Sequence, residues 1–150
     1  LDGEGPGPVD TGDTGVGASL FVDGNGDWHI TYSDGITETF KYMKVTGGTT
    51  PEAAQIIDDD STDDGKAVIG DDSSVWTNGS TIYASYQDVP NGLLKLGPND
   101  GSGWQVKKLT IDGWVNGFTQ VVDVNGSPQI MAHWRKADPN TVGSVILVAP

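Results

Sequence analysis

The stretch SSVWTNGSTIYASYQD, residues 73–88, decides the fold of this 150-residue chain because its pattern occurs three times. It appears earlier as SLFVDGNGDWHITYSD at residues 19–34, and later within FTQVVDVNGSPQIMAHWRK at residues 118–136. In each copy an Asn-Gly pair separates two runs in which apolar and polar residues alternate. These pairs are Asn25-Gly26, Asn78-Gly79 and Asn125-Gly126, which lie 53 and then 47 residues apart. Asn-Gly between alternating runs predicts a β-hairpin with a two-residue type I′ turn.

Short apolar runs follow each hairpin, so each unit contains several strands in series. The first unit continues with ETFKYMKV and EAAQIIDD, the second with GLLKLGPN and GWQVKKLTIDG, and the third with SVILVAP. We therefore expect four short strands in each of the first two units and three in the third. Residues 52–57 fit either one helical turn or an outer strand. Repeats of this length are typical of propeller blades.

The pattern resembles the blade repeats of bacterial secreted and cell-surface β-propeller proteins, over about residues 16–150. The second unit carries the resemblance best, through Thr77-Asn78-Gly79, Ser85-Tyr86-Gln87-Asp88, Asn91-Gly92-Leu93-Leu94-Lys95 and Gly103-Trp104. The first unit has Tyr32-Ser33-Asp34 but lacks the Gly-x-Trp, and the third has His133-Trp134-Arg135 where Tyr-x-Asp would stand. The resemblance implies a fold and carries no catalytic residues over, because the shared pattern is structural and fold does not give function.

We therefore expect an all-β chain of about three four-stranded antiparallel propeller-type blades, at about residues 16–64, 65–113 and 114–150. An extended leader rich in Gly, Pro and Asp precedes them at residues 1–15. Known propellers have four to eight blades, so we expect an incomplete ring. Self-association or another protein chain would complete it by covering the open edge. A β-sandwich built from the same strands is the alternative.

The charge and composition exclude several kinds of partner. The net charge is −13, with 21 acidic residues against eight basic ones, which argues against binding nucleic acid. No apolar run approaches the roughly 18 residues of a membrane span, so we expect no membrane insertion. The absence of cysteine excludes disulfides and cysteine-ligated metals. A Leu1 start and an acidic, turn-rich composition predict an exported protein, processed or excised from a precursor and extracellular, periplasmic or on the cell surface.

Asp23, Asn25 and Asp27 form a D-x-N-x-D pattern, in which oxygens from every second residue can converge on Ca²⁺. The corresponding loops of the other units keep Asn-Gly but lack the acids. A turn rich in Asp and Gly is therefore the preferred interpretation, with weak calcium binding as the alternative and no cofactor required. The run of Asp and polar residues at 58–64 is interpreted as a solvated connection between units.

Four tryptophans are candidate ligand or interface residues, because exposed Trp side chains stack on sugars and anchor protein interfaces. They are Trp28, Trp76, Trp114 and Trp134. Trp104 occupies a blade position and is expected in the core. No catalytic residue is assigned, since no G-x-S-x-G motif occurs and no glycosidase carboxylate pair is identifiable.

The main functional hypothesis is a non-catalytic structural or protein-interaction module of an exported bacterial β-propeller assembly. The alternatives are a carbohydrate-binding lectin and a piece of a glycoside-processing propeller enzyme.

Overall fold

The computed structural model describes residues 14–59, 61, 69–89, 91–109, 114–135 and 144–148, with only the backbone described at 114–117, 134–135 and 144–148. The predicted leader therefore lies outside the described residues, apart from residues 14 and 15. All regular elements in this part of the chain are β-strands. It contains no helix that is long and apolar enough to cross a membrane.

The strands form three antiparallel sheets in chain order. The first contains β1 (Thr14–Val22), β2 (Trp28–Asp34) and β3 (Thr39–Thr46), with β4 (Thr50–Pro51) and β5 (Gln55–Asp58) both paired to the outer edge of β3. The second contains β6 (Ile69–Thr77), β7 (Ile82–Asp88), β8 (Leu93–Asn99) and β9 (Lys107–Leu109). The third contains β10 (Trp114–Val124), β11 (Ser127–Arg135) and β12 (Ser144–Val148). The segment that fitted a helical turn or a strand ends in the outer strand β5.

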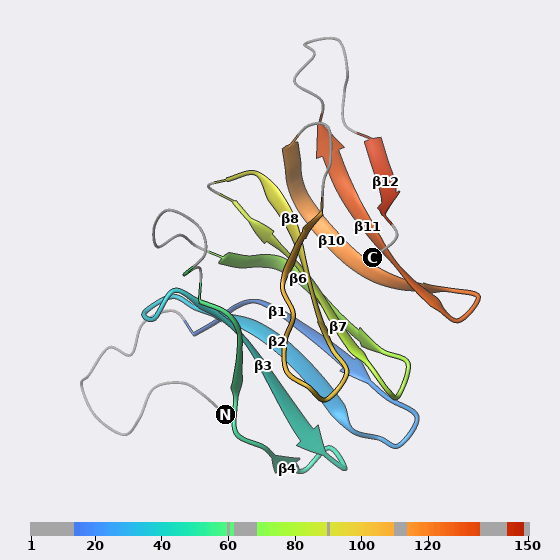
Figure 1. Cartoon of the computed structure of the whole chain (residues 1–150). Helices are drawn as coiled ribbons and strands as arrows, with labels where there is room; N and C mark the ends of the chain where they lie inside the picture. The colour runs from blue at the N-terminus through green and yellow to red at the C-terminus, as the bar shows by residue number, and fades with distance from the viewer. Residues whose placement is uncertain are drawn as a thin grey trace.

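The three sheets lie side by side, with their first strands β1, β6 and β10 next to one another (Figure 1). Strand β6 contacts β1 and β2 on one side and β10 on the other. The arrangement does not close into a ring (Figure 1). The predicted fold class, all-β blades that form an incomplete ring, is confirmed.

Successive sheets are joined by hydrogen bonds at equivalent positions of their first strands. The Ser73 hydroxyl donates to the Gly17 carbonyl at 2.7 Å. In the next interface the Thr119 hydroxyl donates to the Asp72 carbonyl. The pairs are equivalent because each accepting residue lies at a β-bulge with positive φ, 63° at Gly17 and 46° at Asp72.

A second hydrogen bond repeats in the same way. The Val75 amide donates to Ser19 Oγ at 3.3 Å, and the Val121 amide donates to Ser74 Oγ at 3.0 Å. The same kind of contact therefore joins sheet one to sheet two and sheet two to sheet three. These contacts define equivalent positions in the three first strands, which are Gly17, Asp72 and Phe118; Ser19, Ser74 and Gln120; and Leu20, Val75 and Val121.

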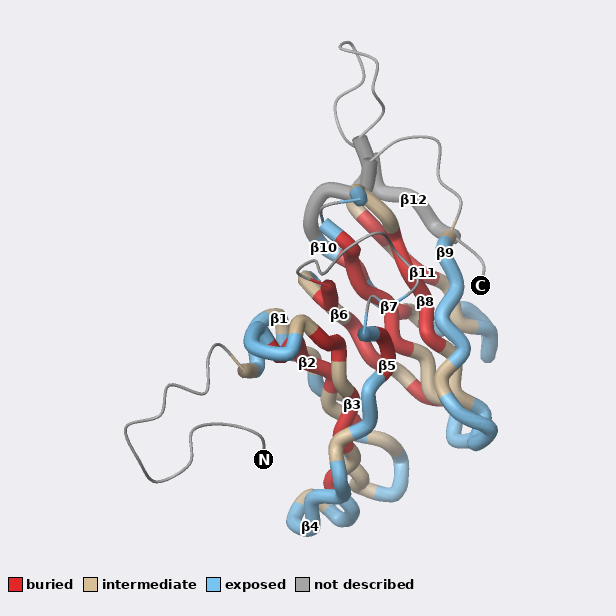
Figure 2. Tube along the Cα trace, turned by 60° about the vertical axis from the view of Figure 1, so that its left-hand side comes forward, coloured by how far each residue is buried: buried red, intermediate tan, exposed pale blue. Residues whose placement is uncertain are grey.

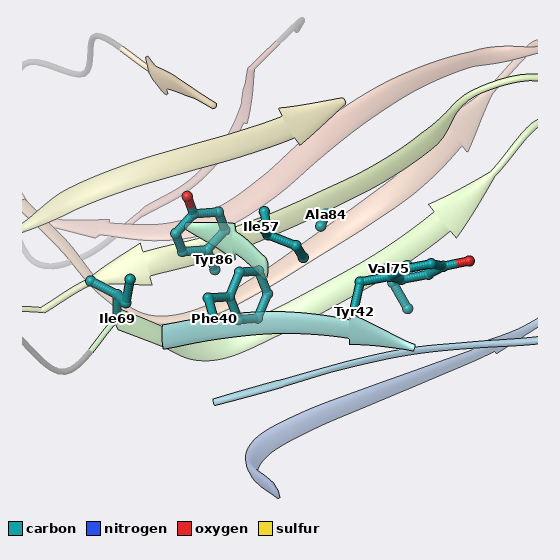
Figure 3. Close-up of a cluster of buried hydrophobic side chains, with 7 residues drawn as sticks. All are labelled: Phe40, Tyr42, Ile57, Ile69, Val75, Ala84 and Tyr86. Atoms are coloured by element: carbon teal, nitrogen blue, oxygen red, sulfur yellow. The ribbon is translucent and has the colours of Figure 1, made fainter. Parts of the chain in front are cut away.

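The hydrophobic core lies between the sheets rather than within any one of them. The first cluster joins Phe40, Tyr42 and Ile57 of the first sheet to Ile69, Val75, Ala84 and Tyr86 of the second (Figure 3). The second cluster joins Leu94 and Leu96 to Ile130 and Ala132 of the third sheet. Figure 2 shows the buried residues along the middle strands, with exposed residues on β4, β9 and the hairpin loops. No sheet can therefore bury its apolar side chains without a neighbour.

The Asp residue that ends the Tyr-x-Asp motif caps the following turn and binds a lysine. Asp34 accepts the amides of Ile36 and Thr37 and binds Lys41 Nζ at 2.7 Å. Asp88 likewise accepts the Asn91 amide and lies 3.2 Å from Lys95 Nζ. The motif therefore stabilises the hairpin between the second and third strands of a sheet.

The two-residue turn predicted for every Asn-Gly pair occurs only at Asn125-Gly126, where both residues have positive φ, 55° and 82°. The other two predicted turns are wrong. Their loops span residues 23–27 and 78–81, because Val22 pairs with Trp28 and Thr77 pairs with Ile82. In both loops a side-chain oxygen of the first loop residue accepts loop amides in addition to the backbone hydrogen bonds. Asp23 Oδ1 accepts two loop amides at 2.9 Å, and Asn78 Oδ1 accepts two at 3.0 and 2.9 Å.

We predict that Gly70→Ala destabilises the protein far more than Gly79→Ala. Both glycines have positive φ, 88° and 91°, so both variants strain the backbone by roughly 1–2 kcal/mol. A Cβ at Gly70 would also overlap the Phe40 ring and the Ser33 hydroxyl, whereas nothing lies within 4 Å of a Cβ at Gly79. Gly70→Ala should therefore cost about 3 kcal/mol or more. Equal costs in chemical denaturation would contradict the close packing of the first two sheets.

We predict that Asp34→Asn destabilises the protein at neutral pH but not near pH 2. Burial alone would raise the pKa of Asp34, but hydrogen bonds from Lys41, Thr37 and Ile36 lower it from 3.8 to about 2. The folded-state pKa is depressed, so this stabilisation is present above pH 4 and is lost as the pH falls through 2. The shift corresponds to about 2 kcal/mol. Unfolding free energies measured between pH 7 and 2 should converge for the two proteins, and a constant gap would refute this role.

Candidate functional site

Two cavities lie in the groove between the first and second sheets. The loop cavity, of about 450 Å³, is lined mainly by the 23–27 loop, the ends of β2 and β3, and the loops at 77–82 and 99–103. The edge cavity, of about 430 Å³, lies between β5 and the β8–β9 region. Both volumes are within the usual range for small-molecule sites.

The loop cavity is strongly polar, but its carboxylates already accept hydrogen bonds from Lys44 or from amides and hydroxyls of the protein. Asp27 binds Lys44 Nζ at 2.7 Å through Oδ2 and accepts the Gly47 amide at 2.7 Å through Oδ1. The hydrogen bond from Lys44 lowers the pKa of Asp27 and raises the pKa of Lys44. Asp23 accepts the amides of Asn25 and Asp27, and these bonds lower its pKa against the opposing effect of desolvation. These contacts hold the loop in its conformation.

His29 forms one wall of the loop cavity and is almost fully buried, at 4% exposure. Its Nδ1 lies 2.8 Å from the Tyr42 hydroxyl, and its Nε2 lies 3.6 Å from Asp23 Oδ2. Burial lowers the pKa of His29 below 6.5, although the neighbouring Asp23 acts in the opposite direction. The imidazole therefore lies between the 23–27 loop and the core, with Asp23 on one side and Tyr42 on the other.

The edge cavity combines an apolar wall with a polar rim. Trp104, Ile56 and Val106 supply the wall, and Ile56 is 55% exposed. Asp59, Ser61 and Lys108 also line the cavity, and all three are exposed. Asp59 accepts the Ser61 amide at 3.1 Å, and the hydrogen bonds from Ser61 lower the pKa of Asp59. The rim therefore presents a carboxylate, a hydroxyl and an ammonium group beside an indole.

A buried charge cluster forms the deep side of the edge cavity. Lys95 Nζ lies 3.0 Å from Asp58 Oδ2 and 3.2 Å from Asp88 Oδ2, and its side chain is fully buried. The Tyr86 hydroxyl donates to Asp58 at 2.6 Å. The interpretation of residues 58–64 as a solvated connection is wrong at Asp58, which is 7% exposed. Its carboxylate is buried because Lys95 and Tyr86 satisfy it.

Trp104 connects the two cavities. Its Nε1 donates to Gln55 Oε1 at 3.1 Å, and Gln55 lines the loop cavity while Trp104 lines the edge cavity. The indole also packs on Tyr42, with ring centroids 5.2 Å apart and planes at 60°. Trp104 is therefore half-buried against the core, as its blade position predicts, and is also a wall of a cavity, which the sequence analysis missed. Its Gly-x-Trp motif was the available signal.

The tryptophans proposed from the sequence as ligand or interface residues do not line either cavity where they are described. Trp28 is 39% exposed at the start of β2, beside Gly48. Trp76 is half-buried on β6 and packs on Tyr83 with ring centroids 5.9 Å apart. The side chains of Trp114 and Trp134 lie outside the described residues. Among the described residues, no three His, Asp or Glu side chains are grouped to hold a metal ion.

Comparison with known proteins identifies similar folds but no sequence family. No protein-family model matches the chain, and no curated protein matches it significantly. A bifunctional GH43-CE protein from Bacteroides eggerthii matches with a TM-score of 0.56 and 12% identity, over 90% of this chain and 18% of that one. A fucose lectin from Kordia zhangzhouensis in complex with methyl-fucoside matches with a TM-score of 0.50 and 14% identity, over 89% of this chain and 99% of that one.

These similarities show the fold alone at such low identity. This chain spans less than a fifth of the Bacteroides protein, whereas it spans almost the whole of the Kordia lectin chain. An all-β arrangement of antiparallel sheets is therefore common to this chain, to the Kordia lectin and to part of the Bacteroides protein.

We predict at most weak calcium binding at Asp23, Asn25 and Asp27. An ion there would have to displace Lys44 and the loop amides from the carboxylates, and the loop has no bidentate Glu. Titration calorimetry should give an affinity far weaker than micromolar in the native protein and a stronger one in Lys44→Met, which removes the competing ammonium. Submicromolar affinity that is lost in Asp27→Ala would establish a calcium site instead.

Proposed function

We propose that this chain is a carbohydrate-binding, lectin-like module without catalytic activity, and that the edge cavity is its sugar site. The observation that carries the proposal is the cavity's composition, an indole and three aliphatic side chains beside a polar rim. The fold similarity to a fucose lectin over nearly the whole of both chains supports it.

The edge cavity has the two kinds of surface that a sugar ring requires. One face of a pyranose presents C–H groups, which pack on an aromatic side chain such as Trp104. Its hydroxyl groups both donate and accept hydrogen bonds. Lys108 can donate to them, the Asp59 carboxylate can accept from them, and the Ser61 hydroxyl can do either.

The loop cavity is the less favourable site, because none of the tryptophans whose side chains are described lines it and its carboxylates hold the loop in its conformation. Asp27 has both carboxylate oxygens bonded, and Asp23 accepts two amides. Asn99 accepts the amides of Gly101 and Gly103. A sugar hydroxyl would gain little by replacing these bonds, since the exchange leaves buried or loop groups unpaired.

The absence of catalysis is part of the proposal. Asp58 is the buried carboxylate of the edge cavity, and Lys95 and Tyr86 hold it in hydrogen bonds and an ion pair. Asp58 is therefore engaged in contacts within the protein, whereas a glycosidase acid must reach the glycosidic oxygen of the substrate. The acidic, turn-rich composition supports an exported protein, where glycans are accessible.

The test compares two neighbouring lysines on β9. Lys107 and Lys108 are both exposed, but successive strand residues face opposite sides and only Lys108 lines the edge cavity. Methyl-fucoside and a glycan array serve as probes for the native chain. For the glycan that binds, Lys108→Ala should weaken affinity by about tenfold, the value of one charged hydrogen bond, while Lys107→Ala should not.

Trp104→Phe provides a second measurement, with Trp76→Phe as its control. The Trp104 variant should lose affinity because the indole area shrinks and the bond to Gln55 is removed. An array without any bound glycan would overturn the proposed function. Equal affinities for the Lys107 and Lys108 variants would exclude the edge cavity as the site. Hydrolysis of reporter glycosides by the purified chain would overturn the non-catalytic part.

A further inference from the structure

The outward face of the first sheet is exposed at positions that are buried in the other sheets. Leu20 is 57% exposed, whereas the equivalent Val75 and Val121 are 4% and 6% exposed. Their cross-strand neighbours follow the same trend. Ala84 and Ile130, opposite Val75 and Val121, are completely buried, but Ile30, opposite Leu20, is only half-buried. The face of the first sheet that points away from the second sheet therefore has apolar residues suited to an inter-sheet contact, but no sheet in the described part of this chain covers it.

The face of the third sheet that points away from the second sheet also has no neighbouring sheet among the described residues. Its residues occupy the positions that accept hydrogen bonds from a following sheet. Gln120 is exposed, whereas its equivalent Ser74 is buried and accepts an amide from the next sheet. Met131, opposite Gln120, is half-buried, whereas the corresponding Thr31 and Ser85 are completely buried.

Phe118 is the most informative residue of this second face. It lies at the bulge with φ of 64° and is 62% exposed. A bulky residue in this conformation is strained. An exposed phenyl ring also loses the favourable free energy of burying its apolar surface. At the equivalent position the Asp72 carboxylate reaches the next sheet and accepts the Phe118 amide at 2.8 Å. The Phe118 side chain accordingly projects toward the place where a following sheet would lie.

We propose that two copies of this chain associate head to tail, with the outward face of the third sheet of one copy on the outward face of the first sheet of the other. Two such contacts close a ring of six sheets with twofold symmetry. Two copies of these three sheets supply six, a number within the four to eight blades that such rings typically contain. This inference does not depend on sugar binding.

The repeated inter-sheet contacts determine the register of the new interface. The Leu20 amide corresponds to the Val75 and Val121 amides, and it would donate to the Gln120 side chain of the partner copy. Ala18 stands where Ser73 and Thr119 have hydroxyl groups, so the second repeated bond is absent. Burial of Leu20 and Phe118 replaces it, and both are larger than their equivalents. The interface is therefore more apolar than the two within the chain.

A second copy fits these faces better than an unrelated protein. Each chain has both faces, the outward face of its first sheet and that of its third. Both faces have the residue pattern that forms the two inter-sheet contacts within the chain. The Kordia lectin chain has nearly the extent of this one, so a chain of this length exists in a solved structure of similar fold. Since each copy has a net charge of −13, association should strengthen with added salt.

The experiment measures the mass of the full 150-residue chain by sedimentation velocity over a concentration series. We expect twice the mass of one chain, with Leu20→Glu weakening association by about tenfold or more, since a carboxylate would be buried in an apolar contact. Ile36→Glu is the matched control, because Ile36 is 52% exposed in the turn between β2 and β3 and lies on neither face. It should leave the dimer intact.

A charge pair then tests the head-to-tail register. Gln120→Lys alone should also weaken association, which keeps the test valid if Leu20→Glu does not fold. The combined Leu20→Glu and Gln120→Lys chain should regain the dimer, because the two positions meet only between copies. A monomer at every concentration, a polymer without closure, or a Leu20→Glu protein that associates as tightly as Ile36→Glu would each overturn the proposal.

Discussion

The bulge in the first strand of each sheet is the constraint on which the rest of the structure depends. It turns one carbonyl out of the sheet, at Gly17 and at Asp72, so that a hydroxyl of the next sheet can donate to it. Two residues further on, the hydroxyl oxygens of Ser19 and Ser74 accept a second hydrogen bond, from a backbone amide of the same following sheet. These paired bonds set the distance at which the apolar clusters meet. Stability therefore resides in contacts between neighbours, as in other repeat proteins.

The same contacts create the groove that holds both cavities. Trp104 forms a single β-bridge with Asn99 at the end of β8 in the second sheet. Its side chain donates a hydrogen bond to Gln55 of the first sheet. Lys95 likewise joins Asp88 of its own sheet to Asp58 of the first. A buried lysine left without one carboxylate would cost several kcal/mol. The proposed sugar site is therefore coupled to the association of the two sheets, and separating them would abolish it.

The sequence predicts the strands well and the site poorly, for a physical reason. Alternation and the repeat are local, so β1–β3, β6–β8 and β10–β12 are visible in single segments of chain. The predicted two-residue turns are wrong at residues 23–27 and 78–81, where a side-chain oxygen of Asp23 or Asn78 supports a longer loop by accepting loop amides. The edge cavity combines β5 with β9, some fifty residues apart, and Trp104 gains its role only from that contact. The Gly-x-Trp motif marks Trp104 as a blade residue, but it does not show that β5 will lie beside it.

Equivalent positions in the three sheets differ in their exposure to solvent. Leu20, Val75 and Val121 are all aliphatic, so the sequence alone assigns them one role. Only their exposure separates them, because two have a neighbouring sheet and one does not. An isolated repeat protein usually protects its terminal units with polar outer faces. Here the outward face of the first sheet exposes Leu20, and that of the third sheet exposes Phe118 in a strained conformation. Apolar faces of this kind favour contact with another sheet over exposure to solvent.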